Sequence, residues 1–170
     1  MRWIPRRNQR PPAQEPGSVE PEPASVEVAV TLWTASGSRQ VEAVVPANTR
    51  LSDLLNDPSA GAMFDVPMDE LLIVVPPAQP TDPTRRLHRP AQLVHLSVGP
   101  YEVSGSAHVP AGADASAFLW RHGQRFVALR RATIEPVGGS ADAPLWDVAL
   151  VNLSMAHSTR SAGGTPLAGP

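Results

Sequence analysis

The sequence predicts a mainly β protein with short helices (β-rich α+β), built from two tandem, barrel-like β-sheet modules of the same plan. Two observations predict this: apolar and polar residues alternate in several segments, and a set of short segments recurs at a shift of 64 positions. The 20 prolines and 12 glycines among 170 residues also disfavour long helices and coiled coils. No cysteine occurs, so disulfides, thiol catalysis and thiolate metal sites are excluded.

The chain begins with a proline- and arginine-rich leader, residues 1–24, which we expect to be disordered. It has no periodic apolar face, so it cannot bury enough surface to offset the entropy of ordering. Its basic start lacks the apolar stretch of a signal peptide, and no run elsewhere approaches the roughly 20 apolar residues of a membrane span. The chain is therefore expected to be cytoplasmic, without a membrane span.

The first module, expected over residues 25–75, opens with a hairpin. Residues 26–33 and 39–45 both alternate apolar with polar side chains, and a four-residue loop would join them. In that register Leu32 opposes Val41, and the apolar sets of the two strands meet on one face.

Pro46 ends this hairpin, because proline cannot donate to a continuing ladder. A short helix follows over residues 48–56, with Asn48 or Thr49 as its cap and Pro58 as its stop. A strand over 68–75 completes the module, and a proline-rich linker is expected over residues 76–90.

The second module, expected over residues 91–157, repeats this order. Its hairpin turns at residues 99–102, where Pro100 argues against a tight two-residue turn with positive φ at both central positions. In that register Leu96 faces Gly105. The remaining expected elements are a helix from Asp114 to Gly123, strands over 126–134 and 146–152, and a flexible tail over 158–170.

The recurrence is clearest where the hairpins end. Val45-Pro46-Ala47 of the first module returns as Val109-Pro110-Ala111 in the second, directly before each expected helix. Each module alone would be small and marginally stable, because a chain of about 60 residues buries only roughly 60% of its surface. We therefore expect the two modules to pack against each other.

The segment Arg50-Leu-Ser-Asp-Leu-Leu-Asn56, preceded by a hairpin and followed by Phe64, resembles a family of small β-rich bacterial domains of unknown function. A late strand containing Val151-Asn152 fits the same pattern. The resemblance implies two degenerate copies over about residues 26–157. The second copy departs from the motif at its helix, which argues against a shared ligand-binding role of the helix. The family brings no established activity, so the resemblance implies more about fold than about function.

Charge is distributed unevenly between the modules. Residues 25–84 carry a net charge of −6, and residues 85–170 carry +3. This asymmetry favours attraction between the modules or between copies of the chain. An alternative is an anion-binding patch for nucleic acid or nucleotides, for which the candidate residues are Arg121, Arg125, Arg130 and Arg131.

Trp33 breaks the alternation of its strand, because it points away from the face of Leu32. Two explanations are open: Trp33 marks a surface for a partner, or the second module covers it. Of the five histidines, His95 and His108 would be diagonal neighbours in the expected register. Two histidines do not make a metal site, so no metal or cofactor is expected.

These observations favour a non-catalytic binding or scaffold protein that acts through association with another protein or with itself. No nucleophile, base or paired carboxylate has the spacing of a catalytic site, so we do not expect an enzyme. Nucleic-acid binding is the alternative, although the net charge of −2 and the 5% aromatic content argue against it. No sequence feature identifies a small-molecule ligand.

Overall fold

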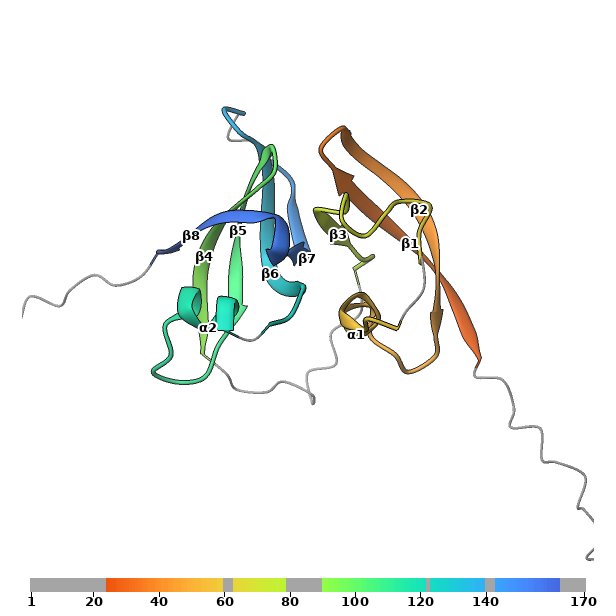
Figure 1. Ribbon diagram of the computed structural model, residues 1–170, viewed down its shortest axis with the longest axis horizontal. Coiled ribbons are helices and arrows are strands. Elements are labelled where there is room, and N and C mark those ends of the chain that lie inside the picture. The colour runs from red at the N-terminus through yellow and green to blue at the C-terminus, as the bar shows by residue number, and fades with distance from the viewer. Residues whose placement is uncertain (1–23, 60–62, 79–89, 122, 140–142, 163–170) are drawn as a thin grey trace, which may run out of the picture.

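The computed structural model describes residues 24–59, 63–78, 90–121, 123–139 and 143–162, the last five by their backbone alone. These residues form a mainly β fold with two short α-helices, as predicted. Eight strands make one curled antiparallel sheet in the order β2-β1-β3-β7-β6-β5-β4-β8 (Figure 1). The strands are β1 (Ser25–Thr34), β2 (Gly37–Pro46), β3 (Ile73–Val75), β4 (Ala91–Val98), β5 (Tyr101–His108), β6 (Phe126–Pro136), β7 (Leu145–Asn152) and β8 (Ala156–Ala162).

The sheet separates two hydrophobic cores. The N-terminal core lies among β1, β2, helix α1 (Leu51–Asn56) and one face of β3 and β7. The C-terminal core lies among β4, β5, β6, helix α2 (Ala115–Arg121) and the opposite face of β3 and β7. The two expected modules therefore share one sheet, although the linker expected over 76–90 is described only at its two ends.

Strands β3 and β7 serve both cores because their side chains alternate between the two faces. Val74 and Leu150 pair across the ladder and belong to the N-terminal core. Ile73 and Val151 also pair and belong to the C-terminal core. A strand buried on both faces is continuously apolar, which explains the short apolar run that ends at Val75.

The first hairpin has the predicted faces but not the predicted register. Val30 pairs with Val41, and Leu32 pairs with Arg39. Only two residues, Ala35 and Ser36, form the turn, so the expected four-residue loop is wrong. The turn closes tightly because Gly37 adopts a φ of 129°, which a residue with a side chain rarely takes. The register moves by two residues, and each side chain keeps its face.

The second hairpin shows the same difference. Leu96 pairs with Val103 instead of Gly105, around the two-residue turn of Gly99 and Pro100. Gly99 has a φ of 56° at the first central position, and Pro100 occupies the second, where a type II′ turn needs negative φ. Proline therefore fits this tight turn, and the objection drawn from Pro100 was wrong.

A bulge bends the sheet where β5 meets β6. Ser104 pairs with Thr133 but Ser106 pairs with Arg130, so the register shifts at Gly105. Arg131 takes a φ of 49° on the opposite strand. A Cβ atom on Gly105 would lie 2.9 Å from the Leu129 Cβ, so this position accepts only glycine without a shift of the core. Bulges increase local twist and help the sheet to curl.

Helix α1 is shorter than expected. Helix α1 begins after Arg50, which provides no side-chain cap, so the predicted cap at Asn48 or Thr49 is wrong. Asn48 instead adopts a φ of 68° in the turn before the helix. The cap of α2 is as predicted: the Ala117 N–H donates to Asp114 Oδ1 at 2.7 Å.

Two further boundaries differ from the sequence prediction. The strand expected over 68–75 is limited to Ile73–Val75, because residues 68–70 form a turn and residues 71 and 72 belong to no strand. The flexible tail expected over 158–170 is wrong for residues 158–162, because β8 extends to Ala162 and pairs with β4, and residues 163–170 lie outside the described residues. The leader, residues 1–23, lies outside the described residues.

Polar side chains join the two halves of the molecule. Asn152 is fully buried, and its Nδ2 donates to the Leu71 carbonyl at 2.8 Å. Arg125 Nη2 donates to the Met68 carbonyl at 2.6 Å. The Tyr101 hydroxyl donates to the Thr34 carbonyl at 3.0 Å. Together with the β3–β7 ladder, these bonds hold the two halves in one arrangement.

Candidate functional site

The outer edge of β2 leaves backbone hydrogen-bonding groups without a strand partner. Thr34 and Gly37 close the two-residue turn as a hydrogen-bonded pair, and such pairs alternate along an antiparallel ladder. The backbone N–H and C=O groups that point away from β1 are therefore those of Ser38, Gln40, Glu42 and Val44. In the described part of the chain, no strand pairs with this edge.

Strand β2 lacks the bulges, internal prolines and lysines that often protect an edge, and its charged residues are Arg39 and Glu42. It runs for ten residues without a register shift against β1, and its proline is its last residue, Pro46. Bulges, internal prolines and lysines are the common means of blocking an exposed edge. The opposite edge strand β8 is shorter, at seven residues, and the β4–β8 register shifts at Ser97 and Val98. The β2 edge is thus the more open of the two.

The side chains beside this edge form a mixed surface, which we call the outer face of the hairpin. It comprises the side chains that point away from the N-terminal core. Val44 is 59% exposed and opposes Glu27, whereas Glu42 opposes Ala29. The two carboxylates are diagonal neighbours on this face. The other described members of the outer face are Ser25, Thr31, Trp33, Ser38, Gln40 and Pro46.

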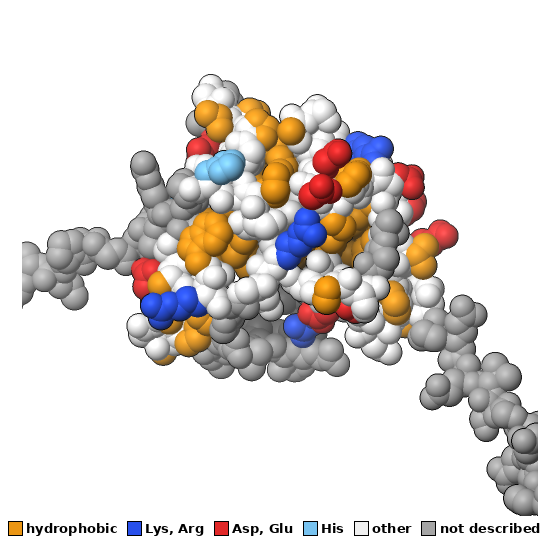
Figure 2. All heavy atoms as spheres, in the orientation of Figure 1, with side chains coloured by type: hydrophobic (Ala, Val, Ile, Leu, Met, Phe, Trp, Pro, Cys, Tyr) orange, Lys and Arg blue, Asp and Glu red, His pale blue; other side chains and the backbone are white. Residues whose placement is uncertain are grey.

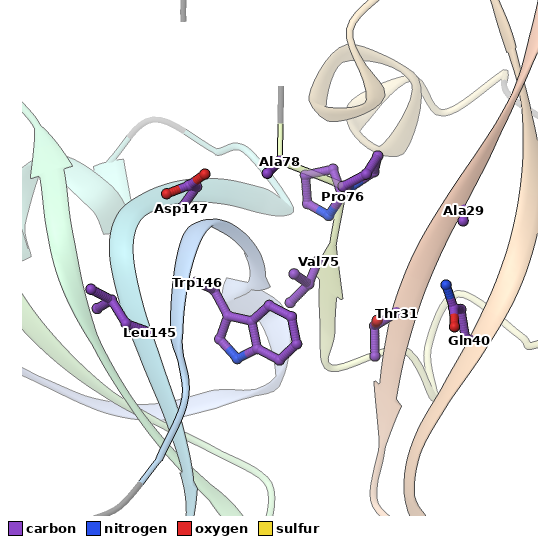
Figure 3. Close-up of a pocket in the computed structure, with 10 residues that line it drawn as sticks. Ala29, Thr31, Gln40, Val75, Pro76, Ala78, Leu145, Trp146 and Asp147 are labelled. Carbon is purple, nitrogen blue, oxygen red and sulfur yellow. The ribbon is translucent and has the colours of Figure 1, made fainter. Parts of the chain in front are cut away.

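A groove of about 330 Å³ separates part of this face from the start of β7. Figure 3 shows the Trp146 indole projecting toward Val75, with Thr31 and Gln40 across the groove on β1 and β2. Trp146 Nε1 is buried and has no hydrogen-bond partner among the described residues. The remaining lining residues are Ala29, Pro76, Pro77, Ala78, Leu145 and Asp147.

The four candidate arginines occupy separate positions. Arg121 is exposed in the last turn of α2, and Arg130 and Arg131 are exposed neighbours on β6. Arg125 is engaged with the Met68 carbonyl, between the two halves of the chain. In the view of Figure 2, the basic side chains lie apart and do not form one area. Arg125 therefore contributes to the joining of the halves.

Arg125 also lines a hollow of about 470 Å³ beside α2. Its Nε atom is buried without a partner among the described residues, so solvent does not reach this nitrogen. The other lining residues are Leu119, Trp120, Gly123, Gln124, Leu153 and Ser154.

Trp33 is covered by the other half of the molecule. Its ring meets Tyr101 edge to face, with a centroid distance of 5.1 Å, and it packs against the C-terminal core. Of the two explanations for its outward position, the structure supports coverage by the second module. Trp33 therefore helps to join the halves.

His95 and His108 are not the diagonal neighbours that the expected register gave. His108 pairs with Ala91, and His95 pairs with Ser104, four residues from His108 along β5. The His95 Nδ1 atom lies 2.6 Å from Ser104 Oγ. Neither of these two residues lines the groove or the hollow. In the described part of the chain, no group of three histidine or acidic side chains is placed to hold a metal ion.

Sequence reasoning missed the asparagines that connect the elements. Asn56 Nδ2 donates to the Phe126 carbonyl, and the Phe126 N–H donates to Asn56 Oδ1, both at 2.8 Å. The other asparagine, Asn152, could have been found from the sequence, because it lies between Val151 and Leu153 in an apolar run. A buried amide needs hydrogen-bond partners, so such an asparagine indicates a junction.

No protein-family model, curated protein or solved structure matches the chain. The relation to small β-rich bacterial domains, suggested by residues 50–56, stays a prediction, as does the internal repeat. No described helix has the length and apolar character needed to cross a membrane.

Proposed function

We propose that this protein is a non-catalytic protein-binding module that takes up an extended polypeptide segment as an additional strand on β2. The observation that supports this proposal is the open edge, where Ser38, Gln40, Glu42 and Val44 direct their backbone groups outward. Strand addition uses such groups for affinity, and it uses side chains on alternate residues for specificity.

The outer face would select the partner through its charge. A strand added to β2 places alternate side chains beside those of Gln40, Glu42 and Val44, because opposed residues of an antiparallel pair share a face. Glu42 and Glu27 give this face two carboxylates that are diagonal neighbours. A basic side chain opposite Glu42 and an apolar one opposite Val44 would therefore complement the surface.

The rigidity of the hairpin supports the same proposal. Val30, Leu32 and Ala43 anchor the inner face of β1 and β2 in the N-terminal core, each with an exposed fraction of 1% or less. A template that does not have to become ordered loses less conformational entropy on binding. The edge is thus prepared for a partner strand without rearrangement.

A selection from displayed random peptides tests the proposal on the full chain. Peptides selected against the wild-type protein should bind the Glu42→Pro variant about tenfold or more weakly, because proline removes one outward N–H. The matched control is Glu42→Ala, which keeps the N–H and loses only the carboxylate. Circular dichroism and thermal unfolding would establish that both variants are folded.

Two results would overturn the proposal. The first is that the selected peptides bind the folded Glu42→Pro variant as tightly as the wild type. The second is that the selection enriches no peptide against a chain that light scattering shows to be monomeric, so that no second copy covers the edge. Basic peptides that bind Glu42→Ala more weakly than the wild type would support the charge preference as well as the edge.

A further inference from the structure

We infer that the strand accepted by β2 is the β2 strand of a second copy, so that two sheets join across a two-fold axis centred on Val41. This inference rests on the proposed function, because it names the partner for the same edge. The partner strand would run antiparallel to β2, and the two eight-stranded sheets would become continuous.

Symmetry limits the registers that two identical strands can adopt. Opposed residues of an antiparallel pair point to the same face of the sheet, and a two-fold axis perpendicular to the sheet preserves that face. One residue of β2 must therefore lie on the axis, directly opposite the same residue of the second copy. The number of registers to compare is small, because β2 has ten residues, Gly37–Pro46.

Charge removes two of these registers. Centring the axis on Glu42 would place two carboxylates directly opposite each other, and centring it on Arg39 would do the same with two guanidinium groups. Like charges directly opposite are destabilising in a sheet. Neither end of β2 offers a better centre, since the overlap shortens as the axis moves away from the middle.

The neighbouring centres, Gln40 and Ala43, give shorter overlaps than Val41. With Gln40 on the axis, Val44 has no opposite residue. With Ala43 on the axis, Pro46 occupies an outward position and cannot donate a hydrogen bond. With Val41 on the axis, the ladder extends over residues 37–45 in both copies, which is the longest overlap that avoids Pro46.

The side chains fit this register on both faces. On the outer face, the Gln40 amide of each copy lies opposite the Glu42 carboxylate of the other, and an amide N–H can donate to a carboxylate. On the inner face, Val41 meets its symmetry mate and extends the apolar surface of the N-terminal core, against which Val41 already packs. Each strand thus places an amide donor opposite the Glu42 carboxylate of the other copy. Ser38 lies opposite Val44 in this register, and the two Glu42 carboxylates are diagonal neighbours.

Cysteine cross-linking tests the register, because the wild-type chain contains no cysteine. Val41→Cys would place two thiols on the axis in a non-hydrogen-bonded pair, where Cα atoms lie about 4.5 Å apart and a disulfide can form. The control is Val44→Cys. Its thiol would lie six residues from its symmetry mate, roughly 20 Å by strand rise.

We expect Val41→Cys to give about tenfold more disulfide-linked dimer than Val44→Cys in a glutathione redox buffer, as resolved on a non-reducing gel. Random collisions would favour the control, because position 44 is 59% exposed and a cysteine there is the more accessible of the two. An excess of dimer from Val41→Cys therefore reports the register. Adding Glu42→Pro to Val41→Cys should remove the excess, since the outward N–H is then lost.

A second pair of variants keeps the test decisive if Val41→Cys does not fold. Chains carrying Gln40→Cys should cross-link to chains carrying Glu42→Cys, and each variant alone should cross-link less. Equal cross-linking of Val41→Cys and Val44→Cys, or none in any folded variant, would overturn the inference. If selected peptides still bound β2 in that case, the proposed function would stand and only the choice of partner would fail.

Discussion

At the scale of single residues, buried polar groups connect the two halves of the chain. Asn152 has no exposed surface, and besides its bond to Leu71 it accepts a hydrogen bond from Ser154 Oγ at 2.6 Å. The Tyr101 hydroxyl reaches the Thr34 carbonyl at the end of β1. A buried polar group is costly unless it is paired, so these residues specify one arrangement of the halves.

Tyr101 makes this junction sensitive to alkali. Burial raises the pKa of the Tyr101 phenol above its ordinary value of 10.0. The unfolded chain ionises this phenol at lower pH than the folded chain does, so folding stability is retained below pH 10 and declines as the pH rises through the folded pKa. Ultraviolet titration can follow this residue alone, because the chain contains one tyrosine.

The native protein should therefore show a higher ionisation midpoint than the urea-unfolded chain. Tyr101→Phe should remove the tyrosinate signal, and it should also remove the part of the alkaline stability loss that this phenol causes. It should lower stability at neutral pH by about 1 kcal/mol through the lost hydrogen bond. A native midpoint at or below the unfolded one would contradict the expectation.

At the scale of elements, helix α1 is attached to β6 by the Asn56 side chain, whose amide pairs with the β6 backbone as a neighbouring strand would. The Asn56 amide exchanges two hydrogen bonds with the backbone of Phe126. A helix of six residues is too short to be stable alone, so this attachment and the packing of Leu55 hold it in place.

Replacing Asn56 with alanine should destabilise the protein by about 2 kcal/mol, because it leaves both Phe126 backbone groups without their partners. The control is Ser52→Ala on the same helix, where the side chain is bonded only to the exposed Asp53 carboxylate at 3.3 Å. Urea unfolding would measure both changes. A loss no larger than that of the control would show that Asn56 does not attach the helix.

The elements also show how far sequence reasoning extends. The faces of β1, β2, β4 and β5 were predicted correctly, because a period of two assigns every side chain once one is assigned. The registers were wrong by two residues, since alternation does not determine turn length. The left-handed φ of Gly99 made a tight turn compatible with Pro100.

The pairing of β3 with β7 could not be predicted from either strand. Ile73, Val74 and Val75 are all buried, so their pattern indicates no preferred face. The open edge at β2 was equally hidden, because an edge is defined by the order of all the strands. Sequence reasoning favoured association, which stays a prediction, and it placed the candidate contacts on arginines and on Trp33.

At the scale of the whole molecule, each half contributes side chains to the hydrophobic core of the other. Leu150 lies on β7, which follows β6 in the C-terminal half of the chain. Its side chain is 3% exposed and packs in the N-terminal core. Phe126 at the start of β6 enters the same core. A change in one half is therefore transmitted to the core of the other, and we expect a single unfolding transition.

Leu150→Ala should lower the free energy of unfolding by about 2 to 4 kcal/mol and should leave one transition in calorimetry. Leu145→Ala is the matched control on the same strand, where the side chain is 60% exposed and should cost less than about 0.5 kcal/mol. Two separate transitions in the Leu150 variant would indicate that the halves unfold independently.

The sharing of β3 and β7 determines where such a chain tolerates division during evolution or engineering. A cut between residues 78 and 90 would look natural in the sequence, but it would separate β3 from its ladder with β7. The fragment carrying β7 would then expose both a strand edge and the apolar side chains of Phe126 and Leu150. A fusion designed to carry an intact core would therefore have to include both halves of the present chain.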